Sequence, residues 1–365
     1  MARWIQVSPV LSPIRIIRTK YFLTAVINCV FLRPVDVDFD ACGRLLVSSD
    51  GGGSGSKIVR IEYHGEESAE EIPPARLPVI ELVAQTFVLK LFEAYLGFSG
   101  ISDELLGDGP LTIFPPWDPA FRGLPEDWIR KLQSRQWGAH LQDILRCHVF
   151  AGDLPLTSLQ ENQTVSMLNG DDVAVTRLEG SSRVRVNGIL VLAPYDATNG
   201  FAYMLDGVLL PSWIDLTLQD VILATTGVFS SFAVWITRTG LESLINNPDE
   251  AMTIFVPDND AIENLDQAAA DYFESEEGVE LLGATLRYHL VQNGPLPSRL
   301  FFASINTNVT TVEGTNIELV DNDPVTVRGT FNEAKLITVD RLANNGLIHV
   351  IDSVLLLGSV PPASR

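Results

Sequence analysis

The chain has 365 residues and a formal net charge of −21, with an isoelectric point near 4.5. This excess of carboxylates argues against nucleic acid and anionic membrane surfaces as partners, because their phosphate groups would be repelled. The length predicts two or three domains. Cys29 and Cys42 lie near the N-terminus and Cys147 is the one cysteine beyond them, so the sequence predicts no disulfide framework for the rest of the chain.

Residues 1–32 show the basic and then apolar order of a secretory signal. Arginines and a lysine within 15–20 precede the apolar run 21–32, which is too short to span a bilayer. The run is followed by Arg33-Pro34 rather than by a small-residue cleavage site. Three interpretations stay open: a signal, a buried strand, and a misjudged start of the coding sequence. No other stretch of the sequence is long and apolar enough to predict an integral membrane span.

Residues 33–63 predict three β-strands. Apolar residues alternate with aspartates over 35–40, and two further apolar segments flank a turn rich in glycine and serine. The aspartates have the spacing of a calcium loop, but Ala41 and Val47 stand where the loop needs glycine and a bidentate glutamate. The sequence therefore predicts a strand here and no metal site. The acidic, proline-containing segment 64–78 has the composition of a linker.

Three sequence blocks then occur twice. The pairs are 112–121 with 253–262, 145–148 with 286–289, and 199–210 with 345–356. The first two pairs share one offset along the chain, since 253 − 112 and 289 − 148 both equal 141, and the third pair has an offset of 345 − 199 = 146. A common register over this distance predicts a duplicated domain, 79–212 and 216–360. The short connection after Trp213 restricts relative motion of the two copies without fixing an angle.

Each copy opens with apolar residues at helical spacing. In the first copy the helix is predicted from Leu82 to Leu96 and to end at Gly97. The 112–121 block then predicts a strand followed by a helix, with Asp118 accepting hydrogen bonds from the free N–H groups of the first turn. Asp258 or Asn259 is predicted to cap the corresponding helix of the second copy.

His148 and His289 each follow an apolar helix. A histidine in this position commonly fixes the backbone of a neighbouring loop through its ring nitrogens, which is a structural role. The alternative is that an exposed edge of the Tyr288-His289 pair contributes to a partner site. Cys147 replaces the tyrosine in the first copy, so that copy would bind less well.

The third block predicts a turn and a central strand. Asn345-Gly346 is a strong turn signal, and the residues that follow are apolar on both faces. Asp352 at the strand end is predicted to accept backbone hydrogen bonds, and Asp206 is its counterpart. His349 lies within the strand where the first copy has Tyr203, a replacement that favours packing over catalysis.

These paired blocks resemble the fasciclin-like (FAS1) domain over roughly residues 79–360. The resemblance implies an α+β fold, a wedge-like β-sandwich with helices packed at one end, and a role in adhesion, matrix or cell-wall association. It implies that Tyr288 and His289 take part in partner binding. The first copy departs from the family pattern at Cys147 and Tyr203, so the resemblance is closer for the second copy.

Residues 33–63 resemble the last blade of propellers of the sorbosone and glucose dehydrogenase type. Because a propeller cannot close on one blade, the sequence favours a remnant. A C-terminal fragment of a quinone-type sugar dehydrogenase fused to FAS1 domains is the rival hypothesis.

Common hydrolase and zinc signatures are absent from the sequence, and the five histidines do not cluster. We therefore expect no catalytic residue and no cofactor. Asn162 and Asn308 begin Asn-x-Thr glycosylation signals in what is predicted to be a polar loop of each copy. The leading hypothesis is a non-enzymatic adhesion or matrix protein, extracellular or at the cell surface, that binds protein or glycan partners. An intracellular or plastid protein without adhesion is a third possibility.

Overall fold

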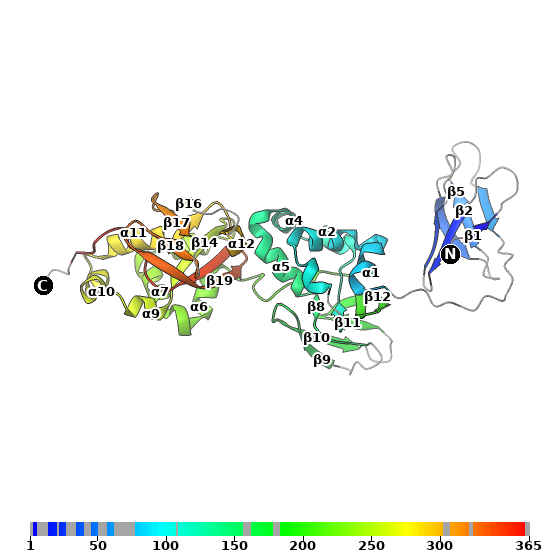
Figure 1. Ribbon diagram of the computed structural model, residues 1–365, viewed down its shortest axis with the longest axis horizontal. Coiled ribbons are helices and arrows are strands. Elements are labelled where there is room, and N and C mark those ends of the chain that lie inside the picture. The colour runs from blue at the N-terminus through cyan, green and yellow to red at the C-terminus, as the bar shows by residue number, and fades with distance from the viewer. Residues whose placement is uncertain are drawn as a thin grey trace. The chain divides into compact units, whose positions relative to one another are not determined.

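The computed structural model divides into two compact units, Met1–Arg76 and Leu77–Arg365 (Figure 1). The second unit is described over residues 77–106, 109–155, 162–177, 183–301, 307–320 and 324–361. In the first unit the description covers the backbone of six strands.

The first unit contains two three-stranded antiparallel sheets, ordered β1-β2-β3 and β4-β5-β6. The strands are β1 Arg3–Ile5, β2 Ile14–Thr19, β3 Phe22–Val26, β4 Pro34–Phe39, β5 Leu45–Ser49 and β6 Lys57–Ile61. The three strands predicted within 33–63 are thus confirmed. The apolar run 21–32 contains β3, whereas its proposed use as a signal and the resemblance of 33–63 to a propeller blade stay predictions.

The second unit contains the two predicted copies, here called domain 1 and domain 2. The helices of domain 1 are α1 Val79–Gln85, η1 Phe87–Leu89, α2 Lys90–Ser99, η2 Ser102–Leu105, α3 Asp118–Arg122, α4 Glu126–Leu132, η3 Arg135–Trp137 and α5 Gly138–Arg146. Its strands are β7 Leu111–Ile113, β8 Val149–Phe150, β9 Asn162–Ser166, β10 Asp172–Arg177, β11 Val184–Val186, β12 Ile189–Ala197 and β13 Gly200–Leu205.

Domain 2 repeats this arrangement. Its helices are α6 Leu218–Ala224, α7 Thr226–Thr239, α8 Glu242–Ile245, α9 Asn259–Glu263, α10 Gln267–Glu274, α11 Val279–Tyr288 and α12 Ser298–Phe301. Its strands are β14 Met252–Pro257, β15 Leu290–Gln292, β16 Thr307–Thr310, β17 Asn316–Val320, β18 Thr326–Arg328, β19 Glu333–Ala343 and β20 Gly346–Ile351. Every residue of β20 is buried, as predicted for a central strand.

Each domain is built on one seven-stranded mixed sheet. The orders are β8-β7-β13-β12-β11-β10-β9 and β15-β14-β20-β19-β18-β17-β16, so the two topologies are the same. The strand of the first block lies parallel to the strand of the third block in both domains, and the other pairings are antiparallel. The duplication and the α+β class predicted from the sequence are confirmed.

The longest strand of each sheet joins its two halves. The first residues of β12 pair with β11 and the last with β13, with a register shift between Val191 and Ala193. β19 joins β18 to β20 in the same way and carries two register shifts. Such bulges bend a strand. Buried side chains from β13 therefore meet those from β9–β11 in a core of their own, separate from the core under the helices.

The predicted first helix of domain 1 is interrupted, and its predicted end at Gly97 is wrong. α1 stops at Gln85, a 3-10 turn follows, and α2 continues through Gly97 to Ser99. Gly100 ends α2 at φ 80°, in the left-handed region that favours glycine. Gly97 keeps a helical backbone, so of the two glycines only Gly100 has the conformation of a helix stop.

Candidate functional site

His148 and His289 each join a helix to a distant backbone segment. The Nδ1 atoms lie 2.8 Å from Ile144 O and 2.7 Å from Thr285 O, one helical turn back. The Nε2 atoms accept hydrogen bonds from the backbone N–H groups of Leu209 at 2.9 Å and of residue 355 at 3.0 Å. Since one partner is an acceptor and the other a donor, the neutral imidazole with hydrogen on Nδ1 satisfies both.

Both histidines are completely buried, and burial lowers the pKa of each to about 4, from an ordinary 6.5. The hydrogen bond to the helix carbonyl opposes this shift in each case. Neutral rings that already use both nitrogens have no capacity left for moving a proton or holding a metal. The structural role predicted for His148 and His289 is thus what the hydrogen bonds show.

The third block fixes a second segment, and the two domains do so with different side chains. Tyr203 Oη donates to Leu154 O at 2.6 Å in domain 1, and His349 Nε2 donates to Leu296 O at 2.9 Å in domain 2. These two leucines occupy equivalent positions after the short strands β8 and β15. A tyrosine and a histidine therefore reach the same acceptor, which explains how the replacement leaves the fold unchanged.

The threonine that opens the first block holds the same leucine from its other side. Thr112 Oγ1 accepts from Leu154 N at 3.1 Å, and Thr253 Oγ1 accepts from Leu296 N at 2.8 Å. Both threonines are fully buried. The first and third blocks of each domain thus converge on one leucine and satisfy both of its backbone groups.

The predicted Asn-Gly turn is also a fastening point. Asn199 Oδ1 accepts from Val79 N, and Asn345 Oδ1 accepts from Leu218 N, so each asparagine holds the first helix of its domain. The following residue must be glycine. A Cβ at Gly346 would come within 1.9 Å of the carbonyl oxygen of the adjacent strand β14, at φ 152°.

One of the two predicted helix caps needs correction. Asp258 caps its own helix, accepting from Ala261 N at 2.7 Å, as expected. Asp118 does not: its Oδ1 accepts from Leu91 N of α2 at 2.9 Å, and α3 has no side-chain cap. Asn259 behaves like Asp118, accepting from Ser231 N of α7 at 3.0 Å. These two residues are related by the offset of the first block, and both attach that block to the second helix.

The expected exposed edge of the Tyr288-His289 pair is wrong, because both side chains are 0% exposed. Tyr288 Oη instead donates to Asn316 O at 3.1 Å and accepts from Thr330 N at 2.9 Å, so it fixes the start of β17 and the turn between β18 and β19. In domain 1 the equivalent Cys147 is a buried free thiol whose pKa burial raises to about 12.

The remaining predicted residues lie at strand ends and on the surface. Asp352 Oδ1 accepts from Lys335 N at 2.7 Å, as predicted, whereas Asp206 is exposed and bonds Leu190 O through its backbone N–H. Asn162 and Asn308 are exposed, but they lie in strands β9 and β16 at the outer edge of each sheet, so the predicted loop location is wrong.

The two glycosylation signals are also out of structural register. Val165 pairs with Val173, and Val309 pairs with Ile317, so the two edge strands correspond at an offset of 309 − 165 = 317 − 173 = 144. The two asparagines have an offset of 308 − 162 = 146 and therefore occupy different places along equivalent strands. Both Asn-x-Thr signals nevertheless lie on an open sheet edge.

One serine, one aspartate and one histidine meet in domain 2, but with the wrong bonds for nucleophilic catalysis. Asp340 accepts from both the backbone N–H and the hydroxyl of Ser298, and Asp340 N donates to His349 Nδ1 at 3.3 Å. The hydroxyl needs a histidine as its base, yet here it bonds to the carboxylate. Within the described residues, no group of three His, Cys, Asp or Glu is placed to hold a metal ion, and no helix is long and apolar enough to cross a membrane.

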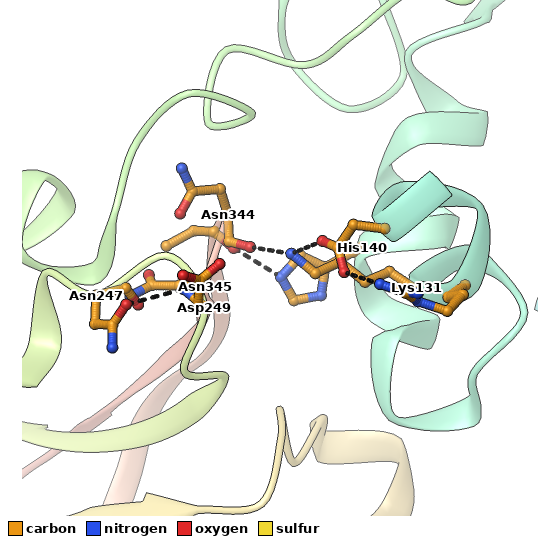
Figure 2. Close-up of polar contacts among 9 residues, drawn as sticks. Lys131, His140, Asn247, Asp249, Asn344 and Asn345 are labelled. Atoms are coloured by element: carbon orange, nitrogen blue, oxygen red, sulfur yellow. Dashed lines mark hydrogen bonds and ion pairs between the residues drawn. The ribbon is translucent and has the colours of Figure 1, made fainter. Parts of the chain in front are cut away.

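Figure 2 shows a polar joint between the domains, which the sequence blocks did not predict. His140 of α5 points its Nε2 at two carbonyl oxygens of the β19–β20 turn, 3.0 Å from Ala343 O and 3.0 Å from Gly346 O. Lys131 of α4 donates to Asn344 O of the same turn at 3.1 Å. Domain 1 thus binds three backbone carbonyls of one tight turn in domain 2.

Aromatic rings surround these two donors. The His140 ring centroid lies 4.5 Å from that of Trp137 and 5.1 Å from that of Trp213. Lys131 Nζ stands 4.7 Å from the Trp128 ring and 4.5 Å from the Trp137 ring, distances at which the cation is attracted to both. We call these five side chains the socket. Burial holds the pKa of His140 at about 4, so its ring is neutral.

The connection between the domains is fastened at both ends. Trp213 Nε1 donates to Asp143 Oδ2 of α5 at 2.7 Å, which ties the connection to domain 1. Leu218 N donates to Asn345 Oδ1 of the turn, which ties it to domain 2. The hydrogen bonds on both sides of the connection supply the restraint that its length alone does not.

Domain 2 lacks the socket. At the offset shared by the first two blocks, Ala269, Tyr272, Gly278 and Leu281 stand where domain 1 has Trp128, Lys131, Trp137 and His140. Sequence reasoning missed the socket because it compared what the copies share. The signal was in what differs, a set of aromatic and basic side chains present in only one copy.

Comparison with known proteins identifies the family to which this architecture belongs. The Fasciclin domain family matches residues 88–211 and 227–357, more than half of the chain. The chain belongs to the fasciclin domain family. The resemblance to tandem FAS1 domains is thereby confirmed.

Several relatives share sequence with the chain at low identity. Periostin of Homo sapiens is 27% identical over 290 residues, covering 78% of this chain and 33% of periostin. Transforming growth factor-beta-induced protein ig-h3 of Sus scrofa is 25% identical over 264 residues, covering 69% and 35%. Stabilin-2 of Rattus norvegicus is 23% identical over 203 residues, covering 52% and 14%. The chain therefore spans about a third or less of these relatives.

Among solved structures, the chain is similar to the FAS1 domain pair from the insect cell adhesion molecule Fasciclin I. The two share 19% identity with a TM-score of 0.39, and the match covers 74% of this chain and 97% of that one.

Proposed function

We propose that this chain is a non-enzymatic binding protein of the cell surface or extracellular matrix, in which two FAS1 domains engage protein or glycan partners. The observation that carries the proposal is the match of two consecutive Fasciclin domains. The structural role of the polar residues in the paired blocks agrees with it. His148, His289, Tyr203 and His349 are buried and bonded to backbone. Such residues build a rigid scaffold, and binding is left to its surface.

The rival, a sugar dehydrogenase fused to FAS1 domains, rests on residues 33–63 alone. The described part of the chain offers no metal cluster, and the Ser298–Asp340–His349 group is bonded for structure. The residues of the paired blocks therefore do not support catalysis by the two FAS1 domains.

An extracellular location is supported by the relatives and by the exposure of both glycosylation signals. Asn162 and Asn308 lie on the surface, where an enzyme could reach them. Expression in a secreting eukaryotic host should give a chain whose mass falls by two glycans on deglycosylation. Loss of one glycan in Thr164→Ala and of the other in Thr310→Ala would locate both, whereas a chain without glycans would count against secretion.

For Tyr288 and His289 we propose an indirect contribution to binding. Tyr288 holds the β18–β19 turn, and His289 holds the segment at Leu355, so the pair shapes two neighbouring surface segments. Tyr288→Phe removes one hydroxyl while keeping the buried ring. It should weaken partner binding through this surface and leave the folded state intact by circular dichroism.

The direct test is attachment of cells to surfaces coated with the full chain. We expect attachment above that on an albumin coat, and lower attachment on Tyr288→Phe. Tyr203→Phe, which removes the hydroxyl at a different place in domain 1, is the matched control and should attach cells like the original chain. Equal attachment on the chain and on albumin would overturn the proposed function.

A further inference from the structure

The turn between β18 and β19 presents an exposed aromatic side chain. Phe331 stands in the four-residue turn 329–332 and is 58% exposed, although the domain has a well-filled core. Single exposed apolar residues are common on proteins and by themselves indicate little. What distinguishes Phe331 is how firmly its neighbours are held.

Both residues that flank Phe331 are anchored to the body of domain 2. Thr330 N donates to Tyr288 Oη at 2.9 Å. On the other side, the Asn332 side chain donates to Val354 O and accepts from Leu356 N, both at 2.8 Å. The turn is therefore fixed on each side of the exposed ring.

The strands leading to the turn are also linked. Arg328 and Glu333 face each other across β18 and β19 and form an ion pair of 2.6 Å, and Glu318 of β17 approaches the same guanidinium at 2.8 Å. Exposed ion pairs contribute little stability, but this one restricts the hairpin. A turn whose backbone is already held in position loses less freedom on binding, which favours association.

Domain 1 has no such turn. Its equivalent strands β11 and β12 are joined by Asn187-Gly188 alone, and the tyrosine beneath is replaced by Cys147, which has no hydroxyl to reach a turn. The longer turn, its aromatic residue and the tyrosine that holds it are thus present together in domain 2 and absent together from domain 1.

Domain 2 also carries an open apolar hollow. It has a volume of about 580 Å³ and is lined by Leu223 of α6 and by Ala233, Val234, Thr237 and Arg238 of α7. Leu223 is 50% and Val234 is 64% exposed, so apolar surface faces solvent there. The hollow is shallow and open to solvent, and its lining is almost entirely apolar.

The hollow too is a property of domain 2. Gly100 and Gly240 end the equivalent helices α2 and α7, and this alignment places Glu93 of domain 1 at the position of Ala233. Glu93 is charged and forms an ion pair with Lys90 at 2.7 Å. A charged group at this place would make the surface unsuitable for an apolar ring.

We infer that Phe331 of one copy of this chain docks into the hollow beside α7 of a second copy. The apolar ring matches the apolar lining. Charge matches as well, because Glu318 and Glu333 outnumber the one cation, Arg328, beside the turn, while Arg238 borders the hollow. The two surfaces are different parts of one domain, so the contact is heterologous. Such contacts extend head to tail unless a ring closes.

The joint between the domains leaves the turn available. The turn 329–332 precedes Glu333, the first residue of β19, whereas the joint begins at Ala343, the last residue of the same strand. The full length of an extended strand separates the two ends. The contact is small, so it belongs to the weak class of interfaces, and the negative charge of the chain opposes it at low salt.

Sedimentation velocity of the full chain tests the inference without relying on cell attachment. Species larger than the monomer should form as the concentration rises to the order of 100 µM, as expected for a small interface. They should increase from low to high sodium chloride, because salt screens the repulsion between copies. Phe331→Ala and Val234→Asp should each weaken association at least tenfold.

A mixture of the two variants gives the sharpest result. Phe331→Ala keeps the hollow and Val234→Asp keeps the aromatic turn, so equal amounts should form one-to-one dimers and nothing larger. Phe87→Ala, which removes a side chain 85% exposed in domain 1, is the matched control and should associate like the original chain.

Three outcomes would overturn the inference: a monomer at every concentration, association unaffected by Phe331→Ala, or association lost in Phe331→Ala but kept in Val234→Asp. The last would mean that the ring docks elsewhere, on a different site or protein. Circular dichroism of each variant checks folding, and Tyr288→Phe, which keeps Phe331 but releases the turn, should associate more weakly than the original chain.

Discussion

The two domains share a set of buried hydrogen bonds and differ in what surrounds them. In both, a histidine joins a helix to a distant loop, and a threonine holds a leucine from one side. On the other side, Tyr203 and His349 donate to the same carbonyl. The difference teaches that this fold requires a donor at a position and tolerates more than one side chain that can supply it.

The surroundings have diverged much further. Residues 79–212 carry nine Lys and Arg against sixteen Asp and Glu, a net charge of −7, whereas residues 216–360 carry six against twenty, a net charge of −14. Domain 1 has the socket that holds its neighbour, and domain 2 has the exposed Phe331 and the apolar hollow. We interpret domain 1 as the domain that fixes its neighbour through the socket, and domain 2 as the domain that presents a binding surface to other molecules.

Acid should have the largest effect on both domains. His140, His148 and His289 have a pKa of about 4 when folded, below the 6.5 of an unfolded chain, so their contribution to stability is complete above pH 6.5 and is lost as pH falls to 4. Each loses about 3 kcal/mol over this window, so the three together lose roughly 10 kcal/mol. Urea unfolding followed from pH 7 to pH 4 measures the loss. A free energy of unfolding that is flat over this range would contradict the assignment of neutral, buried rings.

Removing one structural histidine should make the two domains unfold in separate transitions. His289→Ala leaves the Thr285 carbonyl and the Leu355 N–H buried without partners and opens a cavity, so we expect domain 2 to lose about 3 kcal/mol. Trp235 is the tryptophan within 216–360, so its fluorescence reports on domain 2. His148→Ala is the matched change in domain 1. If both variants shifted the same single transition equally, the domains would unfold as one unit.

Opening the joint should have the smallest effect on stability. His140→Ala removes one ring and a hydrogen bond shared between two carbonyls, for a loss of about 2 kcal/mol, and it frees the domains to reorient. Small-angle X-ray scattering of the full chain should show a broader distance distribution for the variant. Gln136→Ala, which removes an exposed hydrogen bond to Asn293 O at the same joint, should change the curve far less. An unchanged scattering curve for His140→Ala would show that the socket does not set the domain arrangement.

Much of the fold was predictable because duplication exposes what is shared. The paired blocks predicted the duplication, the central strand that the structure has at Gly346–Ile351, a cap by Asp258 or Asn259, and the structural role of both histidines. Asp118 was misassigned because a carboxylate just before a helix fits two acceptor roles, and only the packing of α2 against α3 decides between them.

The paired blocks did not predict which side chains are exposed on the surface. The exposed edge expected of Tyr288 fails because an aromatic residue at the end of a helix can face inward or outward, and the sequence pattern does not distinguish the two. Phe331 and the hollow beside α7 depend on which apolar side chains stay exposed after the domain has packed, and no spacing in the sequence predicts that.

The way in which the socket binds its turn has a consequence for how the two domains can evolve. His140 and Lys131 contact main-chain oxygens of residues 343, 344 and 346, and the Asn344 side-chain oxygen has no hydrogen-bond partner among the described residues. A main-chain oxygen is present whatever amino acid occupies the position. Substitutions at residue 344 can therefore accumulate while these contacts remain, whereas a single change at position 140 removes the contacts to two of the three carbonyls.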